Sequence, residues 1–165
     1  MDIRGNVPTR IQKLRDGHCD ALMLAAAGIT RLQMDLSEFH VQYLDPSSFV
    51  PAPAQGVLAW QCRREDKNTI AILSKIHQAH VQEALFIERT ILQKMNGGCQ
   101  LPLGVYCEKQ NEQFQIHVAF SVGLTSDLLS FHYQTTNAED GISHCLQKIQ
   151  QWQAFSLAEV QKKQV

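Results

Sequence analysis

The stretch that decides the fold is Phe114-Gln-Ile-His-Val-Ala-Phe-Ser-Val122, in which apolar and polar residues alternate. Alternation with a period of two is typical of a β-strand that buries one face. Two further strand-like runs lie beside it in the sequence, at 103–108 and 128–134, and the residues between the runs have the composition of turns. We therefore predict a three-stranded antiparallel sheet.

Helical patterns flank these three runs. Before them, apolar residues recur every three or four positions over 70–95, which predicts one long helix. Asp66 or Asn68 is a suitable cap for its start, and the glycine pair at 97–98 is a suitable end. After them, a helix is predicted from about residue 138, with one apolar face made of Ile142, Cys145, Leu146, Ile149 and Trp152.

The first part of the chain alternates strand and helix patterns. Residues 1–6 have the pattern of a strand end, and Pro8 suits the first turn of a helix that stops at Asp16-Gly17. Residues 20–25 are nearly all apolar, as in a buried parallel strand, and a short helix is predicted over 26–32. Two strands cannot form a parallel sheet covered on both faces, so we expect a C-terminal piece of a longer protein.

A proline-containing connector leads from this part to a further predicted strand at 56–62. We accordingly divide the chain into a partial α/β domain at 1–54, a connecting strand at 55–64 and a small α+β domain at 65–165. The expected fold class is thus α/β followed by α+β.

The composition of the 165 residues excludes several classes of protein. Fifteen Lys and Arg against 16 Asp and Glu give a net charge of −1, which argues against a nucleic-acid partner. The longest apolar run, at 21–29, is too short to cross a membrane, and there is no signal-peptide pattern. Five cysteines without the spacing of a disulfide framework favour a reducing cytoplasm.

Arg4 and Arg10 flank a Gly5-Asn6 turn that opens a helix. The positive end of a helix dipole, free N–H groups and guanidinium forks all favour an anion at such a place. The alternative is that the two arginines are ordinary surface residues at a helix start and bind no ligand.

The cysteines fall into two kinds. Cys99 follows two glycines just after a helix, so its thiol should be accessible, whereas Cys19, Cys62 and Cys145 lie among apolar residues and are expected in the core. We predict no metal site, because no CxxC pair supports the scattered histidines.

Four segments, at 4–14, 20–32, 51–63 and 88–104, together resemble the porphobilinogen deaminase family, also called hydroxymethylbilane synthase. They contain Arg-Gly-Asn-Val-Pro-Thr-Arg, Asp-Ala-Leu-Met-Leu-Ala-Ala-Ala-Gly, Pro-Ala-Gln-Gly and Gly-Gly-Cys-Gln-Leu-Pro-Leu-Gly. The order of the four is that of the family. The sequence departs from the family pattern at Ala54, which replaces a glycine, and at Trp60-Gln61.

The resemblance implies a cytoplasmic, monomeric transferase that condenses four porphobilinogen molecules, with release of ammonia, into hydroxymethylbilane for haem biosynthesis. It implies a dipyrromethane primer, attached by a thioether to Cys99. Both primer and substrate carry carboxylates. The positions that match the family's cleft for these groups are Arg4, Gly5, Asn6, Arg10, Ala25, Gln55 and Arg63.

The family's N-terminal domain, with its catalytic aspartate, has no counterpart in these 165 residues, and no aspartate here is assigned that role. We therefore expect no catalytic residue in this chain, no turnover by it alone, and no attached primer. Two alternatives stay open. One is a non-catalytic carboxylate-binding lobe of the periplasmic-binding-protein type that uses Arg4 and Arg10. The other is a redox-sensing protein that uses Cys99 and Cys107.

Overall fold

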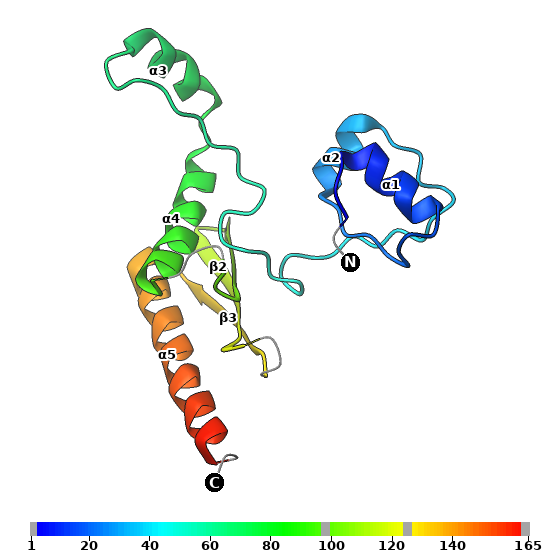
Figure 1. Ribbon diagram of the computed structural model, residues 1–165. Coiled ribbons are helices and arrows are strands. Elements are labelled where there is room, and N and C mark those ends of the chain that lie inside the picture. Colours follow the sequence, from blue (N-terminus) through cyan, green and yellow to red (C-terminus); the bar gives the residue numbers. More distant parts are fainter. Residues whose placement is uncertain (1–2, 97–99, 124–126, 163–165) are drawn as a thin grey trace. The chain divides into compact units, whose positions relative to one another are not determined.

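The computed structural model describes residues 3–96, 100–123 and 127–162 (Figure 1). The chain divides into two compact units, residues 1–44 and residues 45–165.

The second unit is built on the predicted antiparallel sheet. Its strands are β1 (Leu103–Gln110), β2 (Gln113–Phe120) and β3 (Leu129–Thr135), in the order β1-β2-β3. The prediction is confirmed to within two residues at each strand end. The register places Val105 opposite Val118, and Val118 opposite Phe131, so the apolar residues of all three strands share one face.

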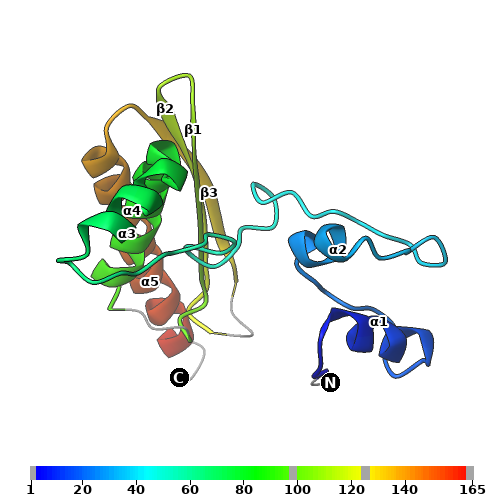
Figure 2. The same cartoon turned by 90° about the horizontal axis from the view of Figure 1, so that it is seen from above.

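Two helices cover that apolar face, α4 (Ala79–Lys94) and α5 (Ala138–Lys162) (Figure 2). The core between helices and sheet consists mainly of aliphatic side chains; its buried members are Ala84, Ile87, Ile91, Leu103, Val105, Cys107, Phe114, Ile116, Val118, Phe120, Ile142, Cys145 and Ile149. Burial of each large aliphatic side chain stabilises the fold by about 1.5–3 kcal/mol. The alternating pattern of the strands and the apolar face of α5 therefore specify this unit.

The long helix predicted over 70–95 is wrong as one continuous element. The structure has α3 (Lys67–Leu73), the 3₁₀ turn η1 (Ser74–Ile76) and α4, with extended backbone at His77 and Gln78. Asp66 caps α3 as predicted, since its side chain accepts the Thr69 N–H at 3.0 Å. No residue of α3 is buried, so packing gives no reason for α3 to continue in line with α4.

The first unit contains α1 (Val7–Arg15) and α2 (Ala26–Leu32), both as predicted. Gly17, at φ +73°, ends α1 in the predicted left-handed conformation. The strands predicted at 1–6 and 20–25 are wrong for the residues that the structure describes, because 3–6 and 21–25 are not paired. A strand needs neighbouring N–H and C=O groups, and nothing within the described part of this unit supplies them.

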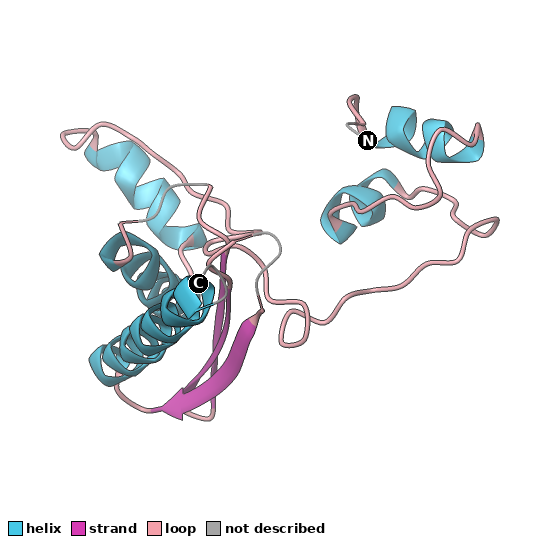
Figure 3. Ribbon diagram, turned by 60° about the horizontal axis from the view of Figure 1, so that its bottom comes forward, coloured by secondary structure: helices cyan, strands magenta, loops and turns pink. Residues whose placement is uncertain are grey.

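The strand predicted at 56–62 is wrong as well: these residues are all described, and the chain from α2 to α3 is drawn as loop in Figure 3. Cys19 and Cys62 are consequently half-buried rather than in the core, whereas Cys145 is fully buried as predicted. Among the described residues, no helix has the length and apolar character that a membrane crossing requires.

Candidate functional site

The start of α1 is a tightly hydrogen-bonded turn. Asn6 caps the helix, and its Oδ1 accepts the Thr9 N–H at 2.9 Å and the Thr9 hydroxyl at 2.7 Å. Gly5 has φ +127°, and a Cβ placed on it would lie 2.9 Å from the Thr9 side chain. The backbone here therefore requires glycine at position 5, next to the capping asparagine.

Three basic residues surround this turn. Arg10 donates its Nε–H to the Gly5 carbonyl at 2.7 Å, and Lys13 donates from Nζ to the Arg4 carbonyl at 3.0 Å. Because Pro8 has no N–H and the Thr9 N–H is bonded to Asn6, the positive character of this helix start comes chiefly from side-chain charge. The sequence interpretation missed Lys13, although it lies one turn after Arg10 on the same helix.

Not every arginine of α1 belongs to this group. Arg15, at the other end of the helix, is paired with Glu38 and lies 5.8 Å from the centre of the Phe39 ring. The hydrogen bond from Arg15 lowers the pKa of the Glu38 carboxyl. Arg15 is therefore engaged within its own unit.

Ala25 is the residue at the N-terminal boundary of α2, where its carbonyl accepts the Gly28 N–H at 3.0 Å. A Cβ on Gly28 would lie 3.4 Å from the Val7 side chain, so α1 and α2 pack closely there. Ala25 itself is exposed. Arg4, Gly5, Asn6, Arg10 and Ala25 thus all belong to the first unit.

Gln55 belongs to the second unit and lies on a turn with unusual backbone geometry. The residues on both sides, Ala54 and Gly56, have φ values of +68° and +80°. The side chain of Gln55 is exposed and lines a groove of about 1070 Å³, whose walls include Trp60, Val81 and Tyr106. The turn therefore presents Gln55 to an open groove.

A buried carboxylate anchors this turn. Glu88 of α4 accepts the Ala54 N–H at 2.7 Å and the Cys107 N–H at 2.8 Å, and only 7% of the residue is exposed. Burial raises the pKa of the Glu88 carboxyl, and the two backbone hydrogen bonds oppose that shift. The sequence interpretation did not assign a role to Glu88, although the residue begins the fourth family-like segment.

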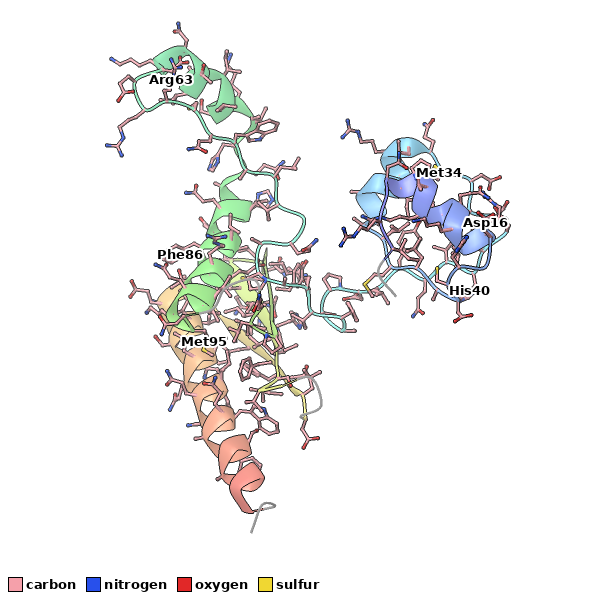
Figure 4. The ribbon with its side chains drawn as sticks, in the orientation of Figure 1. Asp16, Met34, His40, Arg63, Phe86 and Met95 are labelled. Atoms are coloured by element: carbon pink, nitrogen blue, oxygen red, sulfur yellow. The ribbon has the colours of Figure 1, made fainter. Side chains whose placement is uncertain are left out.

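Arg63 lies at the end of the loop that follows the Gln55 turn. It precedes α3, and its side chain is exposed there (Figure 4). Its carbonyl accepts the Asp66 N–H at 3.2 Å, in the turn that leads to the helix cap. Cys99, the predicted attachment site, lies outside the described residues.

The chemistry of Cys107 does not match the redox alternative. Cys107 is buried in β1, and burial together with the nearby Glu88 raises its pKa to about 12. A redox sensor needs an acidic, accessible thiol, so the prediction of Cys107 as a sensor residue is wrong. Within the described residues, no group of three or more candidate ligands could hold a metal ion.

Comparison with known proteins identifies the class. Residues 1–71 match the family model described as "Porphobilinogen deaminase, dipyromethane cofactor binding domain". Residues 83–147 match a second model, "Porphobilinogen deaminase, C-terminal domain". The two matches are consecutive, and the second contains the whole three-stranded sheet.

Individual relatives agree with these models. The chain is 45% identical over 104 residues to the porphobilinogen deaminase of Staphylococcus carnosus. This alignment covers 63% of the chain and 33% of that relative. It is 42% identical over 120 residues to a probable porphobilinogen deaminase of Methanocaldococcus jannaschii, and this alignment covers 71% of the chain and 40% of that relative. It is 36% identical over 139 residues to the Bacillus cereus enzyme, covering 84% and 45%.

The chain therefore belongs to the porphobilinogen deaminase family. It spans 33% to 45% of the length of these relatives. The resemblance drawn from four sequence segments is confirmed.

Proposed function

We propose that this chain is part of a hydroxymethylbilane synthase, the transferase that condenses four porphobilinogen molecules into the linear tetrapyrrole used for haem, releasing ammonia. The observation that carries the proposal is the pair of consecutive matches, first to a cofactor-binding domain and then to a C-terminal domain of one enzyme family. The partner is a small molecule, and the reducing cytoplasm is the proposed location. The four described cysteines are all free, which is compatible with that location.

The α1 turn supports the carboxylate-binding part of the proposal. Each pyrrole of primer and substrate carries an acetate and a propionate, and guanidinium groups bind carboxylates in two-point geometry. We propose that Arg4 and Arg10 bind these carboxylates, with Gly5 and Asn6 shaping the turn that carries them. Lys13 adds a third positive charge at the same turn.

We further propose that Ala25, Gln55 and Arg63 contribute to the cleft for primer and substrate, and that in the complete enzyme Cys99 carries the dipyrromethane through its sulfur. The basic residues of the α1 turn suit such a carboxylate-bearing group. When bound, that group supplies the pyrrole to which the first porphobilinogen is joined. The residues of this chain would bind and orient its carboxylates.

The chain on its own is proposed to lack turnover, because it spans less than half of its relatives and no aspartate in it is assigned the catalytic role. The test is to supply porphobilinogen to the 165-residue chain and measure hydroxymethylbilane, with the full-length Staphylococcus carnosus relative as control. We expect product from the control only. Product from the chain at a comparable rate would overturn this part of the proposal.

The state of Cys99 gives a separate measurement. We propose that the purified chain has a free thiol at Cys99, so its intact mass should match the sequence and rise by one adduct per accessible thiol with a thiol reagent. A mass increased by one dipyrromethane would contradict the free thiol. That result would show that the chain acquires the primer by itself.

A further inference from the structure

Glu88 joins three segments that are distant in the sequence. It lies on the buried side of α4, and its two carboxylate oxygens accept N–H groups from Ala54, 34 residues earlier, and Cys107, 19 residues later. One carboxylate thus holds the Gln55 turn and strand β1 to the same helix. A surface ion pair would not impose such geometry, because exposed side chains have alternatives in water.

Backbone contacts also join the segment before Gln55 to strand β1. In the described sheet, strand β1 pairs with β2 on one side only, so its other edge is open to further partners. On that edge, the Val105 N–H bonds to the Pro51 carbonyl at 3.0 Å. A Cβ on Gly104 would lie only 2.6 Å from the Val50 carbonyl oxygen, so glycine is required for this close approach. Residues 50–54 therefore lie along the edge of β1.

The hydrogen bonds determine the place of Gln55. The Ala54 N–H bonds to Glu88 immediately before Gln55, and the Gln55 N–H bonds to the Ala52 carbonyl at 3.0 Å. Ala54 is a non-glycine residue in the left-handed region, a conformation that the surrounding contacts must maintain. Loss of the Glu88 carboxylate would remove the hydrogen bond that joins this turn to α4.

We propose that Glu88 is a positioning residue. Its carboxylate holds the Gln55 turn, residues 51–56, to β1 and α4, and thereby determines the position of Gln55 in the groove. The assignment rests on the proposed function only in treating Gln55 as a residue that contacts primer or substrate. The anchoring of the turn is a property of this chain alone. The two parts can therefore be tested separately.

The first experiment is hydrogen exchange by NMR on the ¹⁵N-labelled chain. In Glu88→Gln the side chain keeps its size, but its NH₂ group faces one of the two backbone donors and cannot accept. We expect amide exchange to become at least about 10-fold faster at Ala54 or Cys107, whichever N–H faces the NH₂ group, while Ile116 and Val118 in the core strand β2 keep their rates. Unchanged exchange at both Ala54 and Cys107, or equal acceleration at all four amides, would overturn the proposal.

The matched control is Glu83→Gln. Glu83 lies on the same helix, but its carboxylate is half exposed and pairs with Lys109 at 2.9 Å. This variant changes the same charge without touching the turn, so all four exchange rates should match those of the unmodified chain. Faster exchange at Ala54 in this control would mean that charge on α4, and not the Glu88 contact, sets the turn.

A spectroscopic signature separates positioning from general stability. In the unmodified chain, the amide proton shifts of Ala54 and Cys107 should follow one common titration as Glu88 takes up a proton, and Glu88→Gln should abolish it. Independent titrations of the two amides would overturn the shared-carboxylate assignment. Failure of the chain to bind porphobilinogen would count against the proposed function and leave this result as it stands.

Discussion

The two units of the chain differ in how far they bury their apolar residues. In the second unit, three strands that follow one another in sequence pair with their neighbours, and two helices close one face over a core of 13 buried side chains. In the described part of the first unit, Ile11 is the buried apolar residue, while Met23, Leu32 and Tyr43 are at least half exposed. The comparison shows that local pairing partners, and not apolar content, decide which region closes a core.

The largest expected effect comes from removing side chains at the centre of each unit. Ile116→Ala deletes a fully buried side chain in the middle of the sheet and should destabilise the second unit by about 2–5 kcal/mol. Ile11→Ala should destabilise the first unit by less, since few other buried groups surround Ile11 in its described part and the site can collapse. Urea unfolding, followed by NMR signals of each unit, measures both losses. Equal losses would contradict the contrast between the two units.

Substitution of one glycine in each unit tests the same difference between the two units. Gly104→Ala places a Cβ against the Val50 carbonyl oxygen, so the connector must move off the sheet edge, and we expect a loss of about 1–3 kcal/mol. Exchange at the Val105 amide should also become faster, because its acceptor is the neighbouring Pro51 carbonyl.

Gly17→Ala in the first unit is the control for this substitution. Gly17 has φ +73°, but no atom lies within 4 Å of the place that an alanine methyl would take, so the loss should be limited to about 1–2 kcal/mol from backbone strain. If Gly104→Ala left the Val105 amide unchanged, the close approach of 50–51 to β1 would be in error.

The parts of the structure that could be predicted from sequence are those with local causes. Alternation over 114–122 and the apolar face of the last helix each depend on residues a few positions apart, and the capping role of Asp66 depends on Thr69 three residues later. The Glu88 contact to Ala54 spans 34 residues, and no local pattern contains it. The resemblance of residues 88–104 to the family was the only sequence feature that distinguished Glu88 from other glutamates.

The failed strand predictions have a related physical cause. The apolar pattern of residues 20–25 indicates that the segment can be buried, but it does not supply the strand beside which it would lie. The same holds for 56–62, where Leu58 and Trp60 remain largely exposed. The candidate site residues were found by family resemblance, because arginines at a helix start look alike whether or not they bind a ligand.

The smallest predicted effect concerns the face of the sheet opposite the core. There Tyr106, His117 and His132 form a row across the three strands, with the two imidazole rings stacked 4.5 Å apart. Partial burial and the neighbouring His132 lower the pKa of His117, and the opposing influence of Glu108 and Asp45 is weaker. Protonation of His117 is therefore harder in the folded state than in the unfolded chain.

The sign of the resulting pH dependence follows from this lowered pKa. The contribution of His117 to stability is fully present above its unfolded pKa near 6.5 and is lost as the pH falls through the lower folded value. Between about pH 7 and about pH 5, the second unit should lose less than about 1 kcal/mol through this residue, since His117 is partly solvated. Urea unfolding at both pH values should show a smaller difference for His117→Gln, while His18→Gln in the first unit leaves the difference unchanged. An identical pH difference in His117→Gln and the unmodified chain would exclude His117 as its source.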